Sequence, residues 1–94
     1  MGALWIANVH VTDEEAYKKY AAIATDAIAA HGGVFLARAG KHKQLEGRDR
    51  ARNVVARFPS LEAAEACYHS DLYQSGLAHA KGAAERDLVI VEEL

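Results

Sequence analysis

The order of the predicted elements constrains this chain more than any other feature. Four apolar, strand-like runs are set around two helix starts, at Thr12 and Ser60, in the order β-α-β-β-α-β over 94 residues. This order is that of the split βαβ motif of a ferredoxin-like sandwich, in which one antiparallel sheet carries both helices on the same face. The pattern therefore predicts an α+β fold and a single domain over residues 1–94. Because this scaffold supports many unrelated activities, the fold alone does not indicate a function.

Capping and turn residues predict where the elements begin and end. Thr12 to Glu15 has the pattern of a capping box, and Gly32 is a typical left-handed helix stop. Ser60 and Ser70 are typical N-caps. The expected elements are a strand over 3–11, a helix from the capping box to about residue 30, strands over 34–39 and 53–58, helices over 61–69 and 72–80, and a strand over 87–93.

Three of the four predicted strands are apolar on both faces, although the helices of such a sandwich cover only one face. The opposed sets are Trp5 and Val9 against Leu4 and Ile6, Val34 and Leu36 against Phe35 and Ala37, and Leu88 and Ile90 against Val89 and Val91. An uncovered face of this kind exceeds the few hundred Å² of apolar patch that monomers expose. Two sheets packed face to face would bury it, so we predict a homodimer with Trp5 near the interface.

Charge and cysteine content narrow the function classes. Residues 38–57 hold seven Lys or Arg and two acids, a local charge of +5 that leaves −7 for the rest of the chain. A solvated hairpin explains this basic segment better than a nucleic-acid partner does, because the remainder is acidic. The single cysteine, Cys67, excludes an internal disulfide framework and is expected to be an inert core residue. With no leader peptide and no apolar run of about 20 residues, we predict a cytoplasmic protein with no membrane partner.

Several short segments along the chain carry a family resemblance. They are His31-Gly32-Gly33 before a strand that ends at Arg38, Leu45-Glu46-Gly47, Phe58-Pro59-Ser60-Leu61-Glu62-Ala63, and Tyr68-His69-Ser70 with Tyr73. Together they span nearly the whole chain and resemble the bacterial family catalogued as domain of unknown function 1330. The resemblance implies a dimeric α+β barrel, an architecture shared with small antibiotic-synthesis-type monooxygenases and muconolactone isomerases. It implies no established reaction.

Two residues are candidates for chemistry. His31 ends the first helix, where it is either a proton-transfer residue or a cap that binds the free carbonyls of the last turn. In a regular strand Arg38 shares the face of Val34 and Leu36. It then either forms a buried ion pair with Glu46 or anchors an anionic ligand.

Aromatic and remaining histidine side chains complete the candidate set. Tyr17, Tyr20, Tyr68 and Tyr73 either line a cleft or fill the core. His10, His69 and His79 lack the spacing of a zinc motif, and no phosphate-binding loop or nucleophile motif is present, so we expect no metal and no cofactor.

The sequence thus predicts a homodimer that binds a small aromatic or carboxylated molecule between the sheet and the helices. The residues expected around that ligand are Arg38, Tyr17, Tyr20, Glu46, Tyr68 and Tyr73. The alternative is a cofactor-independent monooxygenase or isomerase of the dimeric α+β barrel type, with His31 as acid or base.

Overall fold

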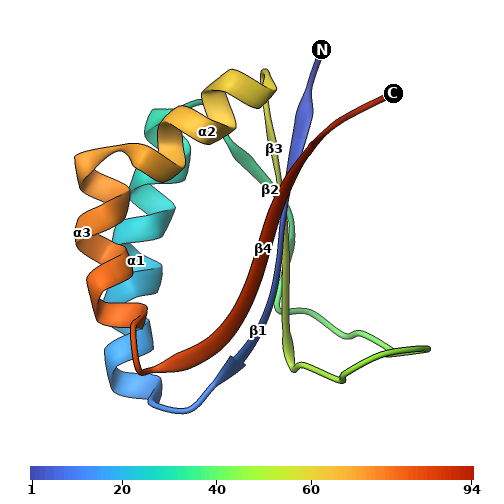
Figure 1. The fold of residues 1–94 in the computed structure, drawn as a ribbon, viewed down its shortest axis with the longest axis vertical. Helices are drawn as coiled ribbons and strands as arrows, with labels where there is room; N and C mark the ends of the chain where they lie inside the picture. Colours follow the sequence, from blue (N-terminus) through green and yellow to red (C-terminus); the bar gives the residue numbers. More distant parts are fainter.

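The structure of this chain, a computed structural model, describes all residues 1–94. The elements in chain order are β1 (Ala3–Val11), α1 (Glu14–Ala30), β2 (Val34–Arg38), β3 (Arg52–Phe58), α2 (Leu61–His69), α3 (Asp71–Ala80) and β4 (Ala84–Glu92). The strands form one antiparallel sheet in the order β2-β3-β1-β4, and all helices cover the same face of it (Figure 1). This arrangement confirms the predicted α+β, ferredoxin-like fold.

Helix α1 begins one residue later than the capping box predicts. The N-cap is Asp13, whose carboxylate accepts a hydrogen bond from the Ala16 amide at 3.2 Å. The Thr12 amide donates to the Ala83 carbonyl at 2.8 Å, which ties Thr12 to the start of β4 and keeps it out of the helix. The predicted stop is confirmed, because α1 ends at Ala30 and Gly32 has a φ of +80°.

Two strands begin earlier than the sequence predicts. Strand β3 starts at Arg52 instead of Asn53, and β4 starts at Ala84, three residues before the expected Asp87. Both extensions pair with β1, which is long enough to accept them on its two sides. As a result, Arg52 and Arg86, which the predicted strand boundaries leave outside the strands, lie within the sheet.

The main core lies between the sheet and the helices, at the end of β1 that is near the chain termini. Trp5 is 1% exposed, and its ring centroid is 5.6 Å from that of Phe58 and 5.2 Å from that of Tyr73. The prediction that Trp5 lies near a dimer interface is therefore wrong, because its side chain faces the helices. Helices α1 and α3 pack closely here, since a Cβ at Gly76 would be 2.8 Å from Ile23 Cγ2.

The other face of the sheet is uncovered and carries apolar side chains, as predicted. Val34 and Val89 are 61% and 55% exposed on it, and Leu4, Ile6 and Val55 lie between them on the central strands. None of the helices is long and apolar enough to cross a membrane.

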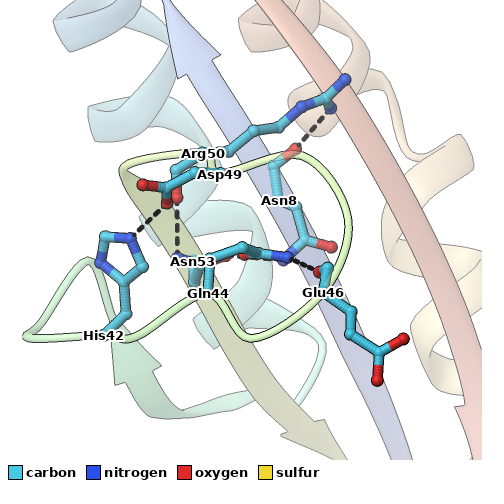
Figure 2. A network of polar contacts seen from close by, with 7 residues as sticks. All are labelled: Asn8, His42, Gln44, Glu46, Asp49, Arg50 and Asn53. Atoms are coloured by element: carbon cyan, nitrogen blue, oxygen red, sulfur yellow. Dashed lines mark hydrogen bonds and ion pairs between the residues drawn. The ribbon is translucent and has the colours of Figure 1, made fainter.

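The β2–β3 loop (residues 39–51) projects from the side of the sheet that faces away from the helices (Figure 1). At its base Arg50 donates to the Asn8 carbonyl at 3.2 Å, and His42 Nε2 lies 2.9 Å from Asp49 Oδ1 (Figure 2). Arg50 also forms an ion pair with Asp87 at 2.8 Å. Arg48 lies 3.4 Å from Glu85. Two cations of the basic segment thus have acidic partners on β4.

Candidate functional site

Two inward-facing arginines flank the middle of the sheet at one level. Arg52 of β3 and Arg86 of β4 both lie opposite Val9 of β1, one on each side. Side chains alternate between the faces of a strand, so Arg52 shares the face of Val54, and Arg86 shares the face of Leu88. Both guanidinium groups therefore enter the layer between the sheet and α1.

Arg86 is bound by two tyrosine hydroxyls that come from different helices. Its Nη2 donates to the Tyr20 hydroxyl at 2.7 Å and to the Tyr73 hydroxyl at 3.3 Å, and these hydroxyl oxygens are 2.8 Å apart. One phenol must donate to the other, so the hydrogen of the second phenol has no acceptor within the protein. The group therefore has a hydroxyl hydrogen left to donate to a ligand.

Burial keeps both phenols neutral. It is the largest influence that raises the pKa of Tyr20 and of Tyr73, and in both cases it outweighs the opposite effect of the Arg86 charge. Burial by itself lowers the pKa of Arg86, but the adjoining Tyr20 and Tyr73 oxygens raise it on balance. A charged guanidinium beside two protonated phenols is therefore the state of this group at neutral pH.

Arg52 has no hydrogen-bond partner for its buried Nε. Its guanidinium carbon lies 5.4 Å from the centroid of the Tyr17 ring, and the Nε atom of Arg86 is likewise buried without a partner. Neither Arg52 nor Arg86 forms an ion pair with a carboxylate. Partly buried cations without a counter-charge are costly, which indicates a role other than stability.

Arg38 joins these two arginines because strand β2 is irregular. The register against β3 shifts between Phe35 and Ala37, and this bulge turns Arg38 to the face of Phe35 instead of that of Leu36. Its guanidinium lies 4.3 Å above the Phe35 ring and donates to Thr25 Oγ1 at 2.7 Å. The predicted strand face of Arg38 is therefore wrong.

The predicted ion pair between Arg38 and Glu46 is also wrong. Arg38 is exposed and forms no ion pair, and the only bond to Glu46 is the one that its backbone carbonyl accepts from the Gln44 amide. Figure 2 shows the Glu46 carboxylate directed away from its labelled neighbours. Glu46 belongs to the β2–β3 loop, which leaves the sheet on the opposite side from the helices, so this residue does not lie at the site.

The three arginines line one small cavity. The cavity, named here the arginine cavity, has a volume of about 30 Å³, contains Tyr17 and Tyr20 in its wall, and has no acidic side chain in its lining. A second cavity of about 340 Å³, named here the outer cavity, shares Tyr17 and Arg52 with it. The two cavities therefore adjoin and together have the size of a small-molecule site.

The tyrosines are divided between the two predicted roles. Tyr17 and Tyr20 are buried and also line the arginine cavity, so they belong to both core and site. Tyr73 is fully buried and contributes its hydroxyl through Arg86. Tyr68 lies apart, beside His69 in a third cavity of about 230 Å³ between α2 and β4.

His31 is a helix cap by its geometry. Its Nδ1 is 2.8 Å from the Ala27 carbonyl in the last turn of α1, and it lines none of the three cavities. A proton-transfer role has no support from this placement. No group of three His, Cys, Asp or Glu side chains is placed to hold a metal ion. Cys67 is buried, as predicted, and burial raises the pKa of its thiol to about 11.

Sequence reasoning missed Arg52 and Arg86, which are central to the site. Both lie next to the predicted start of a strand, so an error of one to three residues in that boundary removed them from the sheet. The signal was present in the alternation itself. Extending the inward positions Val54 and Leu88 back by two residues leads to Arg52 and Arg86.

The sheet order and the cavity above it define a ferredoxin-like α+β protein with a cationic site between sheet and helices. The chain belongs to the family described as Domain of unknown function (DUF1330), which matches residues 2–94 and confirms the resemblance seen in the sequence. No curated protein matches the chain.

Solved structures share the fold at low sequence identity. A protein of unknown function from Rhodopseudomonas palustris is 18% identical, with a TM-score of 0.80 over 99% of this chain and 82% of that one. A dimeric ferredoxin-like protein of unknown function from Thermobifida fusca is 18% identical, with a TM-score of 0.66 over 99% and 92%. SnoaB, a cofactor-independent oxygenase from Streptomyces nogalater, is 12% identical, with a TM-score of 0.65 over 99% and 93%. These similarities show that this chain has the same fold as those proteins.

Proposed function

We propose that this protein is a homodimer that binds a small aromatic carboxylate in the arginine cavity between its sheet and α1. One observation carries the proposal: Arg38, Arg52 and Arg86 line a single cavity that contains no acidic side chain. A carboxylate accepts paired hydrogen bonds from a guanidinium, and such charge-assisted bonds are about twice as strong as neutral ones. An anionic ligand would therefore offset the cost of the unpaired cations.

The volumes of the two cavities suggest how the ligand lies. The arginine cavity holds about 30 Å³, which suits the carboxylate group alone, whereas the outer cavity holds about 340 Å³ and has room for a ring. Tyr17 and Arg52 border both, so they would contact the ligand where its carboxylate joins its ring. Tyr17 offers that ring an aromatic partner.

The arginine cavity supports binding of an anion more directly than turnover. An isomerase or a cofactor-independent oxygenase needs a base at the reacting carbon. The lining of the arginine cavity contains neither a carboxylate nor an imidazole, although Glu14 and His10 line the outer cavity. The oxygenase activity of SnoaB is that of a protein only 12% identical to this chain. Because the three arginines account for binding of an anion, we infer a binding role.

The dimer proposal depends on the uncovered sheet face. Val34, Leu36, Val89 and Val91 are between 47% and 61% exposed there, and a face of this kind is typical of a protein interface. The Thermobifida fusca protein, which has the same fold, is dimeric. A second copy of this chain, packed sheet to sheet, would cover the face.

Calorimetry with benzoate and benzamide tests the ligand proposal. These probes have the same ring, and only benzoate is charged, so we expect benzoate to bind and benzamide to bind at least about tenfold more weakly. Arg86→Met should abolish benzoate binding, whereas Lys19→Met, which removes an exposed cation of α1, should leave it unchanged. Equal binding of both probes, or no binding of either, would contradict the proposal.

Sedimentation velocity at low micromolar concentration tests the dimer. We expect about twice the monomer mass of 10.2 kDa. Val89→Asp, which places a charge on the uncovered face, should yield monomers, while Glu62→Asp on the surface of α2 should remain dimeric. A folded wild-type monomer at that concentration would refute a dimer.

A further inference from the structure

The outer cavity adds a second recognition group to the proposed carboxylate site. Arg52 and Glu14 both line this cavity of about 340 Å³, and they form no ion pair with each other. A cation and an anion that border one cavity without meeting leave space for an occupant between them. Such an occupant would present an acceptor to Arg52 and a donor to Glu14.

Glu14 lies about one helical turn from Tyr17, a residue that the two cavities share. Tyr17 borders both cavities, and Glu14 lies three residues before it on α1, which corresponds to an axial rise of about 4.5 Å. A ring whose carboxylate lies in the arginine cavity and whose body extends past Tyr17 into the outer cavity directs its para substituent toward the end that Glu14 lines.

We propose, on the basis of the proposed function, that the ligand carries a hydroxyl or amine group opposite its carboxylate, and that Glu14 accepts a hydrogen bond from it. The ligand class is then a para-hydroxy or para-amino aromatic carboxylate. Glu14 determines specificity in this site, while the arginines supply most of the affinity.

A control variant distinguishes ligand recognition by Glu14 from a purely structural role at the start of α1. Glu14 and Glu15 both lie in the first turn of α1, where acids interact favourably with the helix dipole. Glu15 lines none of the cavities and lies 3.9 Å from Lys18. Glu15→Ala is therefore the matched control, since it removes the same kind of charge from the same turn without touching the site.

The test compares benzoate, 4-methoxybenzoate and 4-hydroxybenzoate by calorimetry at pH 7 with the wild-type protein and both variants. Only 4-hydroxybenzoate has a hydroxyl group at the para position that can donate a hydrogen bond. We expect it to bind about tenfold more tightly than the other two probes. Glu14→Ala should remove this preference, so that 4-hydroxybenzoate binds no more tightly than benzoate. Glu15→Ala should retain the preference.

Each other outcome overturns a specific statement. If the wild-type protein binds benzoate without preferring 4-hydroxybenzoate, the donor recognition is wrong and the carboxylate site stands. If the preference survives in Glu14→Ala, Glu14 is not the acceptor. If none of the three carboxylates binds, the proposed function fails together with this inference.

Discussion

The layer between the sheet and the helices has two ends that differ in chemistry. At the end near the chain termini, Trp5 packs against Phe58 in a buried aromatic core. At the other end, four residues further along β1, Val9 lies between Arg52 and Arg86. The aromatic end stabilises the fold, whereas the arginine end holds partly buried cations that form no ion pair with a carboxylate. A small domain keeps such an end only where something other than its own stability requires it.

Tyr73 connects the two ends. Its ring packs edge-on against Trp5 at 5.2 Å, and its hydroxyl accepts a bond from Arg86 at 3.3 Å. The same side chain thus belongs to the core by its ring and to the site by its oxygen. The rigid core positions the site through this residue, which is how a chain of 94 residues supports both.

Removing the central aromatic side chain should have the largest effect. Trp5→Ala deletes a ring that is 1% exposed, and we expect a loss of about 3–5 kcal/mol in the free energy of unfolding, from lost burial and the remaining void. Urea denaturation followed by circular dichroism measures this loss. Trp5→Phe, which retains a ring, should lower the free energy of unfolding by less. A loss below about 1 kcal/mol in Trp5→Ala would mean that the aromatic end is not the main source of stability.

Alkaline pH should weaken the fold through the buried phenols at the arginine end. The pKa values of Tyr20 and Tyr73 are raised in the folded state above the ordinary value of 10.0, so their contribution is complete below pH 10 and is lost as the pH rises above it. Each such tyrosine adds a slope of about 1.4 kcal/mol per pH unit there.

Denaturation at several pH values between 9 and 11.5 measures that slope. Tyr20→Phe removes one of the two phenols, so its slope should be shallower than that of the wild type by the contribution of one tyrosine. Tyr68→Phe is the control, because Tyr68 lies outside the network. Identical slopes in all three proteins would show that Tyr20 ionises as readily in the folded as in the unfolded chain.

The sequence predicted the elements that build the aromatic end better than the residues of the arginine end, although it placed Trp5 near the uncovered face, and the reason is physical. Helix caps and apolar alternation are local signals, and they placed β1, α1 and α2 and the buried Cys67 correctly or within one residue. The prediction that Arg38 shares the strand face of Val34 and Leu36 failed because a bulge is an irregularity that alternation does not encode. Arg52 and Arg86 were missed because charged residues at strand ends look like loop residues until their pairing partner is known.

Replacing an unpaired arginine should cost little or no stability. Arg52→Met keeps the long aliphatic stem and removes a charge whose buried Nε has no partner, so we expect the free energy of unfolding to stay unchanged or rise by up to about 1 kcal/mol. Benzoate binding should weaken in the same variant. This combination, stability kept and binding lost, is the signature of a functional residue. A loss of more than about 1 kcal/mol would instead assign Arg52 to the fold.

The smallest effect is expected at His31, which lies outside both the aromatic core and the arginine cavity. Its Nδ1 bonds the Ala27 carbonyl at the end of α1, and His31→Gln retains a side-chain amide that can donate to the same carbonyl. We therefore expect a loss below about 0.5 kcal/mol by urea denaturation and an unchanged affinity for benzoate, since the ring lines no cavity. The ligand measurement decides between cap and site residue, because a cap affects only the stability of the helix end. If His31→Gln lowered benzoate affinity tenfold with stability intact, the site would extend to the C-terminal end of α1. The ligand site would then not be confined to the arginine end.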